Sequence, residues 1–389
     1  MIVLCASHLY TPREEVNNPL LFIEDGVVTA VSSRGEREIP TNVTVVDLGD
    51  AILAPGFIDI HMHGGAGLDV MRASPTELPR LHQFLAAHGV TGYFPTTVAA
   101  GLDETCLALE RMADSIEAGE IPQPSNGDRM QARPLGVHLE GPFLSHKRRG
   151  VHSPENLLDP TLPVFDRLWQ AARGHVRMMT IAPELPGALE VISEAARRNV
   201  CVSIGHSDAV LEMARAATKA GARHATHTFN AMRPLDHRDP GILGEVLTDR
   251  SLSADIIADG IHVAPEIVRL FLQAKGFEGA VLITDATAAA GMPDGIYRLG
   301  PMQVEVKDGK CMKDGKLAGS VLTMDSAVRN LTRFSGWSLP HAVQAATLNP
   351  SRATGLAGHG QITPGSDANI VVLSPGGEVR KTIVRGHGF

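Results

Sequence analysis

The first part of the chain carries short apolar stretches with no helical period. Residues 20–24 and 27–31 are two such stretches on either side of Asp25-Gly26, a dipeptide typical of two-residue hairpin turns. Residues 43–48 form another stretch of strand length. We therefore predict a small β-domain at the start of the chain, and Pro55-Gly56 marks the passage into a different pattern.

After Gly56 the pattern becomes strand, loop and helix in repetition. We predict strands at 57–61, 93–98, 135–140, 177–182, 200–206, 225–227, 254–258 and 281–285. Stretches with helical spacing lie between most of them, at 75–88, 103–117, 188–198, 209–220 and 265–275. Eight strands alternating with helices predict a (β/α)8 TIM-like barrel, with an open doubly wound sheet as the alternative.

The loop after the first barrel strand argues against a dinucleotide fold. Its sequence, Gly64-Gly65-Ala66-Gly67, does not match the glycine-rich phosphate fingerprint. Beyond residue 285, we predict a hairpin around Asp308-Gly309, followed by helices at 323–334 and 339–346, the second ended by Asn349-Pro350. We assign no chemistry to the hairpin region at 295–317.

Composition narrows the classes of function. The formal net charge is −8, and no cluster of Lys and Arg is long enough to follow a phosphate backbone, so we expect no nucleic-acid partner. No apolar stretch is long enough to span a bilayer, and the N-terminal residues do not have the pattern of a signal peptide. Four cysteines without CxxC spacing are typical of free thiols, so we expect a cytoplasmic protein.

Ionisable side chains stand where the predicted barrel strands end. His61 and His63, one residue apart in an extended segment, point to the same side. Four of the other seven predicted strands end in a Glu, a His or an Asp, at Glu140, His206, His227 and Asp285. Since the active site of such a barrel is built at the C-terminal ends of its strands, these groups share one rim. Buried ionisable groups are costly unless they are paired or bind a metal, so the set favours a metal centre.

Several motifs in order along the chain carry a family resemblance. They are His61-Met62-His63, His138-Leu139-Glu140-Gly141-Pro142-Phe143, Gly205-His206-Ser207, Thr226-His227-Thr228-Phe229-Asn230-Ala231-Met232, Ile257-Ala258-Asp259-Gly260-Ile261-His262 and Thr284-Asp285-Ala286-Thr287. Together they resemble the amidohydrolase superfamily, and within it the N-acetylglucosamine-6-phosphate deacetylase family. The resemblance implies a metal-dependent barrel at residues 55–354 and a small β-sandwich built from both chain ends, 1–54 and 355–389.

The resemblance also implies roles for the rim residues. Glu140, His206 and His227 match the constant metal ligands of the family, and His61 and His63 match a second metal position. One or two divalent ions per subunit are therefore expected, with zinc or iron as the candidates, because the mixed nitrogen and oxygen ligands suit several metals. The family's bridging lysine has no counterpart at the matching strand end, so Glu140 takes the bridging role. Asp285 matches the catalytic acid and base.

Further residues match substrate contacts. His152 and His262 match substrate-binding histidines of the family. Arg238 matches an arginine that binds the phosphate and is associated with a homodimer, in which it acts on its own or on the neighbouring subunit's site. Asn230 and Ala231, which follow His227, offer a side-chain amide and a backbone N–H to oxygens of a sugar or phosphate.

The activity implied is hydrolysis of the N-acetyl group of an amino sugar phosphate, N-acetylglucosamine 6-phosphate, by metal-activated water. Asp285 would accept the proton of the water and pass it to the leaving amine. The alternatives are the galactose epimer of the substrate, a cyclic amide, or a non-enzymatic scaffold that has lost its metal. The missing Gly-x-Ser-x-Gly stretch disfavours an acyl-enzyme route.

Overall fold

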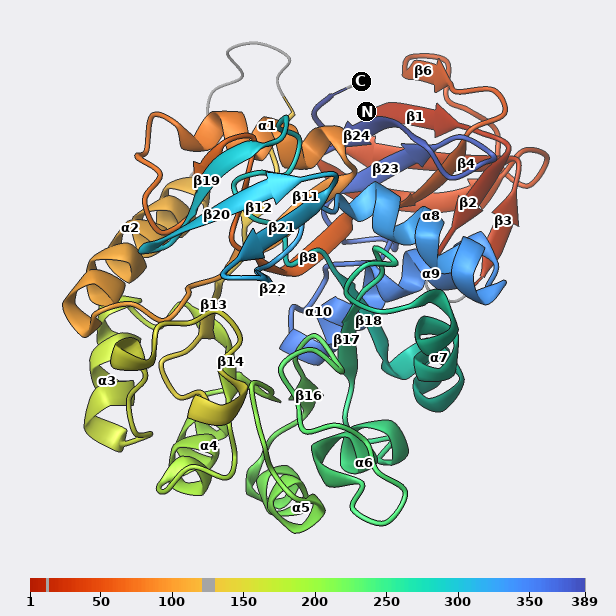
Figure 1. Ribbon diagram of the computed structural model, residues 1–389. Helices are drawn as coiled ribbons and strands as arrows, with labels where there is room; N and C mark the ends of the chain where they lie inside the picture. Colours follow the sequence, from red (N-terminus) through yellow and green to blue (C-terminus); the bar gives the residue numbers. More distant parts are fainter. Residues whose placement is uncertain (12–13, 121–129, 389) are drawn as a thin grey trace.

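The computed structural model describes residues 1–11, 14–120 and 130–388. Residues 12–13 and 389, which belong to the predicted β-domain, lie outside this description, as do residues 121–129. Figure 1 shows the two parts of the fold: a ring of strands covered by helices, and a pair of sheets in which the first and the last strands of the chain lie together.

Both chain ends build the smaller part. One sheet has the order β5-β4-β1-β6, from Val27–Ser33, Pro19–Glu24, Ile2–Cys5 and Thr44–Asp47. The other has the order β24-β23-β7-β2-β3, from Val379–Ile383, Ile370–Leu373, Ile52–Pro55, His8–Tyr10 and Glu15–Asn17. A cluster of buried aliphatic side chains from both sheets, including Leu4, Leu21, Leu53 and Ile370, fills the space between them. The predicted sandwich and the Asp25-Gly26 hairpin are thus confirmed, while the boundaries at 54/55 and 354/355 stay a prediction.

The larger part contains eight parallel strands in sequence order. These are β8 (Phe57–Met62), β11 (Val90–Pro95), β13 (Val137–Glu140), β14 (Val176–Ile181), β15 (Cys201–Ile204), β16 (His224–Ala225), β17 (Ala254–Ile257) and β18 (Ala280–Ile283). Their ladders form three separate sheets: β8 with β11 and the short β12 (Arg133–Pro134), β13 to β16, and β17 with β18. The described strands therefore form no single continuous barrel sheet.

Backbone hydrogen bonds across the three gaps bring the sheets into one ring. Thr97 N–H donates to the carbonyl of His138 at 3.0 Å, and Thr228 N–H to that of Asp255 at 2.9 Å. Asp285 N–H donates to the carbonyl of His61 at 2.9 Å, which joins the last strand to the first. The fold prediction of a TIM-like barrel is confirmed, and the strand ends on which it places the ionisable side chains meet at one rim.

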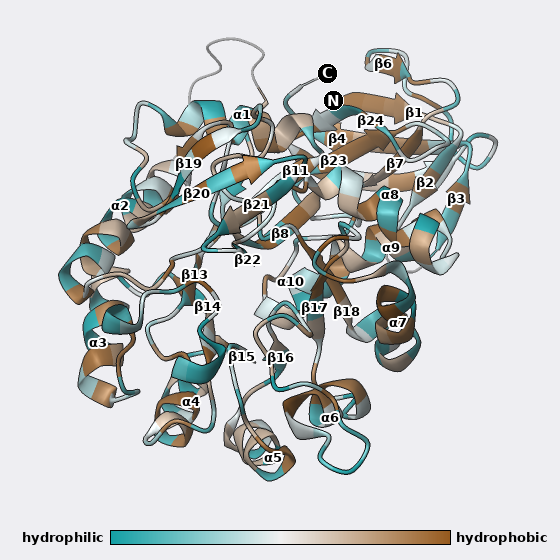
Figure 2. Ribbon diagram, in the orientation of Figure 1, coloured by the Kyte–Doolittle hydropathy of each residue, from teal (hydrophilic) through white to brown (hydrophobic). Residues whose placement is uncertain are grey.

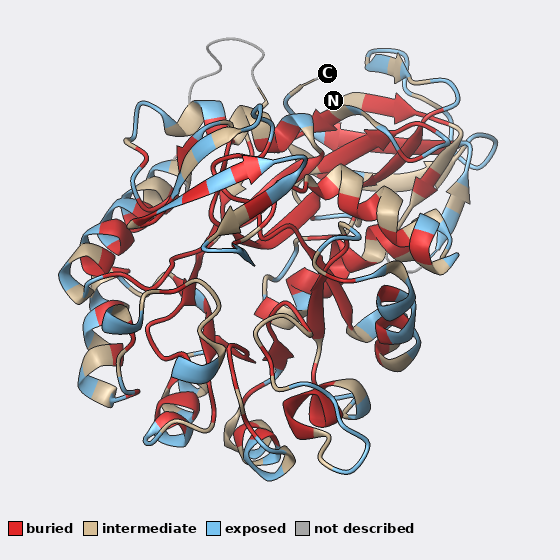
Figure 3. Ribbon diagram, viewed as in Figure 1, coloured by how far each residue is buried: buried red, intermediate tan, exposed pale blue. Residues whose placement is uncertain are grey.

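Helices cover the outside of the ring. They are α1 (Leu78–Ala87), α2 (Leu102–Glu120), α3 (Leu162–Ala171), α4 (Ala188–Arg197), α5 (Leu211–Ala220), α6 (Gly241–Thr248), α7 (Pro265–Gly279), α8 (Met324–Ser335), α9 (Leu339–Ala345) and α10 (Leu348–Thr354). Figure 3 shows buried strands at the centre and helices most of which are exposed on their outer side, and Figure 2 shows the matching hydropathy. This pattern is that of amphipathic helices packed on a fully buried parallel sheet.

Three predictions about elements were wrong in detail. The second barrel strand runs from Val90 to Pro95 and not over 93–98. Helices α3, α6 and α10 were not predicted; α6 is buried nearly all round, so it shows no polar face in the sequence. Pro350 does not end a helix but lies in the first turn of α10, where its missing N–H costs no hydrogen bond.

An antiparallel insert follows the last barrel strand. It consists of β19 (Gly295–Leu299), β20 (Met302–Lys307), β21 (Lys310–Lys313) and β22 (Lys316–Leu317). The predicted hairpin at Asp308-Gly309 connects β20 and β21 and is confirmed. Figure 1 shows this insert in front of the barrel strands, and we call it the β19–β22 insert.

Among the described residues, no helix has both the length and the apolar character needed to cross a bilayer.

The side chain of Asn349 ties α10 to the barrel, and this contact gives a test of the fold. Its amide donates to the carbonyls of Phe277 and Ala280, both at 2.7 Å, and the residue is buried. We expect Asn349→Leu to lower the free energy of unfolding by about 1–3 kcal/mol for each carbonyl left without a donor. Urea unfolding measures this change. Asn17→Leu, at an exposed position of β3, is the control, and equal midpoints for both variants would contradict the assignment.

Candidate metal centre and active site

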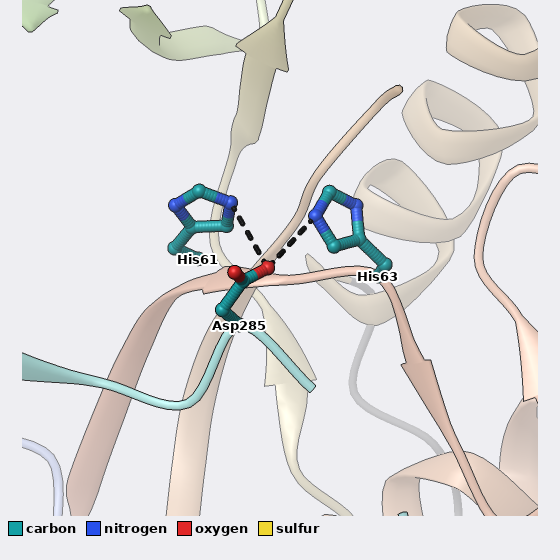
Figure 4. Close-up of side chains that lie close together, drawn as sticks. All are labelled: His61, His63 and Asp285. Carbon is teal, nitrogen blue, oxygen red and sulfur yellow. Dashed lines mark ion pairs between the residues drawn. The ribbon is translucent and has the colours of Figure 1, made fainter. Parts of the chain in front are cut away.

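Two histidines at the end of β8 face one carboxylate. His61 is the fifth residue of β8 and His63 follows its end, so both imidazoles point to the same side. Figure 4 shows both Nε2 atoms directed at one oxygen of Asp285. The distances from Oδ1 of Asp285 are 3.6 Å to His61 and 3.1 Å to His63. All three residues are buried, so this group can bind a cation away from bulk solvent.

Glu140, at the end of β13, lies between these histidines and a second pair. Its Oε2 is 3.5 Å from Nε2 of His61 and 3.2 Å from Nε2 of His63. Its Oε1 is 3.1 Å from Nε2 of both His206 and His227, which follow β15 and β16. The structure thus brings together all five residues that the sequence predicted as metal ligands, with one carboxylate shared between two histidine pairs.

The spacing of the ligand atoms fits a divalent metal. The Nε2 atoms of His206 and His227 are 3.1 Å apart, so with Oε1 of Glu140 they form a triangle with 3.1 Å edges. Ligands at the zinc–nitrogen distance of about 2.0–2.1 Å in a tetrahedral site lie about 3.3 Å from one another. In addition, Nε2 of His61 is buried and makes no hydrogen bond within the described part of the chain. Both observations are what a metal site requires.

Charge at the site favours a cation as well. Burial by itself lowers the pKa of His63, but hydrogen bonds and charges from Asp285 and Glu140 outweigh it and raise this pKa to about 10. Burial raises the pKa of the Asp285 carboxyl, and the charges of His61 and His63 bring it down to about 2. Burial raises the pKa of the Glu140 carboxyl, but the neighbouring histidines bring it well below its usual value. Two ionised carboxylates therefore face the histidines, and a divalent ion can replace the positive charge that His63 otherwise carries.

Backbone carbonyls orient the ligand histidines. Nδ1 of His63 lies 3.1 Å from the carbonyl oxygen of Thr96, and Nδ1 of His206 lies 2.8 Å from that of Arg148. A carbonyl only accepts, so each Nδ1 carries the proton and each Nε2 keeps its lone pair for the centre of the site. Arg148 is itself held by a hydrogen bond of 2.8 Å from its Nε to Asp208, so the loop segment that carries Arg148 positions a ligand.

Three of the site residues have strained backbone. His206, His227 and Asp285 have φ values of 46°, 29° and 51°, in the left-handed region that non-glycine residues rarely adopt. Each follows the end of a barrel strand, where the chain must turn sharply to aim the side chain at the rim. Such strain persists only where surrounding contacts hold it, and it concentrates at functional sites.

A cavity of about 160 Å³ opens above the ligands. Four of the predicted substrate-binding residues line it, and these are His152, Asn230, Ala231 and His262. His63, Glu140, His206, His227 and Asp285 line its floor. The predicted ligand set and most of the predicted substrate contacts are therefore on one concave surface.

His152 presents a donor to the cavity. The backbone N–H of Ala99 donates to its Nδ1 at 3.2 Å, so the proton of the neutral ring is on Nε2. Burial and the charge of His206 lower the pKa of His152 to about 3, which keeps the ring neutral. Nε2 lies 3.9 Å from Oε2 of Glu140, near the ligands but bearing its own hydrogen. His152 is thus placed as a hydrogen-bond donor and not as a metal ligand.

Arg238 is not brought to this cavity. It is exposed on the loop after β16, and its backbone N–H donates to Asp236 at 2.8 Å. The lining residues of the cavity do not include it. Any contact between Arg238 and a phosphate must therefore be made outside the cavity of its own chain.

Asp255 is a residue of the site that the sequence reasoning missed. It is fully buried in β17, where its Oδ1 accepts a hydrogen bond from the backbone N–H of His227 and its Oδ2 lies 2.9 Å from Nε2 of His224. It holds the strained backbone of a ligand residue in place. The available signal was a carboxylate inside an otherwise apolar strand, since a buried charge needs a partner.

Comparison with known proteins agrees with this geometry. A curated N-acetylgalactosamine-6-phosphate deacetylase of Escherichia coli O157:H7 is 38% identical over 386 residues, covering 99% of this chain and 98% of the relative. The N-acetylglucosamine-6-phosphate deacetylase of Bacillus subtilis is 35% identical over 381 residues, covering 97% and 94%.

Solved structures give the same answer. A mutant of the Mycobacterium smegmatis N-acetyl-D-glucosamine-6-phosphate deacetylase, in complex with N-acetyl-D-glucosamine-6-phosphate, superposes with a TM-score of 0.91 at 36% identity and covers 99% of this chain and 98% of that one. The Thermotoga maritima N-acetylglucosamine-6-phosphate deacetylase has a TM-score of 0.86 at 32% identity, covering 98% and 97%. The model of the amidohydrolase family matches residues 52–387. The resemblance predicted from the motifs is confirmed, and the chain belongs to the amidohydrolase family.

Proposed function

We propose that this chain is a metal-dependent hydrolase that removes the acetyl group from N-acetylglucosamine 6-phosphate, giving glucosamine 6-phosphate and acetate. The observation that carries the proposal is the meeting of five ligand-type side chains and Asp285 at one place, where all of them except the fully buried His61 line the floor of one cavity. Relatives named for this activity align with nearly the whole chain. The relative that acts on the galactosamine compound makes the epimer the second candidate.

The metal would be held by the residues described above. Glu140, His206 and His227 form one ligand set, and His61 and His63 with the second oxygen of Glu140 form another, so one or two ions fit. Zinc is the ion we propose first, because imidazole nitrogen and carboxylate oxygen at this spacing are its common ligands, and ferrous iron is the alternative. A bound divalent ion lowers the pKa of water and polarises the acetyl carbonyl.

The protein's own groups then move the proton and hold the substrate. Ionised Asp285 accepts the proton of the attacking water and returns it to the departing amine. The Nε2–H of His152 donates to an oxygen of the substrate close to the ligands. Asn230, the backbone of Ala231 and His262 stand at the wall where the sugar hydroxyls would lie.

We further propose a cytoplasmic homodimer. All four cysteines, Cys5, Cys106, Cys201 and Cys311, are free and buried, as is usual in a reducing compartment. The exposed Arg238 lies outside the cavity of its own chain, so we propose that it reaches the phosphate bound by the other subunit. Its planar guanidinium is suited to paired hydrogen bonds with phosphate oxygens.

The activity is tested by acetate release from a set of sugars after loading with Zn²⁺ or Fe²⁺. We expect N-acetylglucosamine 6-phosphate to be hydrolysed with a higher kcat/KM than its galactose epimer and than the unphosphorylated sugar, because the phosphate supplies binding energy that the parent lacks. Preference for the epimer would favour the second candidate. Release of ammonia or ring opening of a cyclic amide, without acetate release, would contradict both.

The ligand assignment is tested with a pair of histidine variants. We expect His227→Gln to lose bound metal and acetate release together, since it removes one corner of the ligand triangle. His237→Gln, at an exposed histidine ten residues further on, is the control and should keep both. Metal content by atomic spectroscopy and turnover are measured on the same samples. A His227→Gln variant with full metal content would show that the ion lies elsewhere.

The role of Arg238 is tested with hybrid dimers. We expect Arg238→Ala to raise KM for the phosphorylated sugar, and Asp285→Asn to lower kcat by roughly 10²–10⁴-fold. A dimer with one subunit of each variant has one complete site if Arg238 acts across the interface, so about half of the wild-type activity should return. Co-expression with two affinity tags gives the hybrid. No recovery at low substrate concentration would place Arg238 in its own subunit's site or outside the reaction.

A further inference from the structure

The lining of the cavity combines two groups of residues with different chemistry. One carries the polar groups of loops that follow β13, β16 and β17, namely His152, Asn230 and His262. The other group is apolar and consists of Leu299 and Leu317 from the β19–β22 insert and Ala318, which follows it. We call these three residues the apolar wall. Leu299 and Ala318 are 2% and 1% exposed, so these side chains are packed in place.

The apolar wall stands next to the reacting carboxylate. Ser320 N–H donates to the carbonyl of Asp285 at 2.7 Å, and Thr287 N–H donates back to the carbonyl of Ser320 at 2.9 Å. A Cβ added to Gly319 would lie 3.5 Å from Oδ1 of Asp285 and 2.7 Å from the Thr287 side chain. The segment from Leu317 to Ser320 therefore runs directly beside the catalytic group.

The other edge of this wall is fixed as well. Gly300, which follows Leu299, donates its N–H to Asp69 at 2.6 Å and accepts a hydrogen bond from Arg72 at 2.9 Å. A Cβ at Gly300 would come within 2.2 Å of Val98, another residue of the cavity lining. The turn thus packs closely on the barrel, and Leu299 has little freedom to retreat from a larger ligand.

From this geometry we propose that Leu299 and Leu317 hold the alkyl end of the acyl group and limit its size. The inference rests on the proposed function. The carbonyl carbon under attack must lie near Asp285. The acetyl methyl group is bonded directly to that carbon, so it also lies near Asp285. Against Leu299 and Leu317 this methyl group buries apolar surface, whereas the hydroxylated sugar finds partners on the polar wall. The β19–β22 insert is thereby the element that selects the acyl group.

The experiment compares N-acetyl, N-propionyl and N-butyryl glucosamine 6-phosphate as substrates of the metal-loaded enzyme. One methylene in an apolar pocket changes discrimination by about 10–200-fold, so we expect the wild type to prefer the acetyl compound by at least tenfold over the propionyl one. In Leu317→Ala and Leu299→Ala we expect this ratio of kcat/KM values to fall by about tenfold or more. Release of the free amine is the measurement.

A matched control lies on the same insert. Ile296, on β19 with Leu299, is 71% exposed, so Ile296→Ala should leave the acyl ratio unchanged. Leu317→Phe reverses the change: we expect it to depress turnover of the acetyl compound more than that of the N-formyl compound. This variant fills space instead of removing it, so it tests the proposal even if the alanine variants do not fold.

The possible failures are distinct. A wild type that releases acetate, with acetyl-to-propionyl ratios that are equal in wild type, Leu317→Ala, Leu299→Ala and Ile296→Ala, would overturn the inference and leave the proposed function standing. A well-folded, metal-loaded wild type that hydrolyses none of the acyl sugar phosphates would overturn the proposed function itself.

Discussion

The burial of one carboxylate among four histidines is the constraint on which this structure depends. Glu140 is 3% exposed, and both of its oxygens face imidazole nitrogens contributed by other strands. A carboxylate in such a place costs several kcal/mol unless positive charge and hydrogen bonds compensate it. The ring of parallel strands supplies that compensation, because it brings the ends of β8, β13, β15 and β16 to one point.

The same requirement explains the strained backbone at the rim. Residues in the left-handed region cost of order 1–3 kcal/mol each, so His206, His227 and Asp285 need support from their surroundings. Asp255 holds the backbone N–H of His227, and the pairing of Asp285 with Ser320 holds the last strand end. A fold with fewer buried hydrogen bonds around the rim would relax these residues and separate the ligands.

The spacing of apolar residues along the chain predicted most of the barrel strands and the amphipathic helices between them. The strand ends that carry His61, Glu140 and His206 were visible because each closes a mainly apolar run. The helix α6 was missed because it is buried nearly all round, has only Glu245 and Thr248 as polar residues, and contains Gly241 and Gly244, so neither its period nor its composition indicates a helix. Asn349-Pro350 was interpreted as the end of a helix, although proline is also common in the first turn of a helix, where Pro350 lies.

Contacts between distant segments were beyond the reach of the sequence. Nothing in the residues around Asp255 tells which backbone its carboxylate will meet, and the hairpin at 302–313 carries no sign that its flanks, Leu299 and Leu317, will form a wall of the cavity. Each of these roles is set by which strands become neighbours in the closed ring. Only the residues that are themselves at a strand end, and of ligand type, could be assigned to the site in advance.

The charged residues that line the cavity bear on how a phosphate group would be bound. A sugar phosphate brings close to two negative charges at neutral pH. The described residues that line the cavity include no Lys or Arg, and its metal-binding floor already carries two carboxylates. The described lining therefore offers apolar and polar groups to the acyl and sugar parts of such a substrate, but no Lys or Arg side chain to its phosphate. The exposed Arg238, which lies outside this lining, is the residue that we propose for the phosphate.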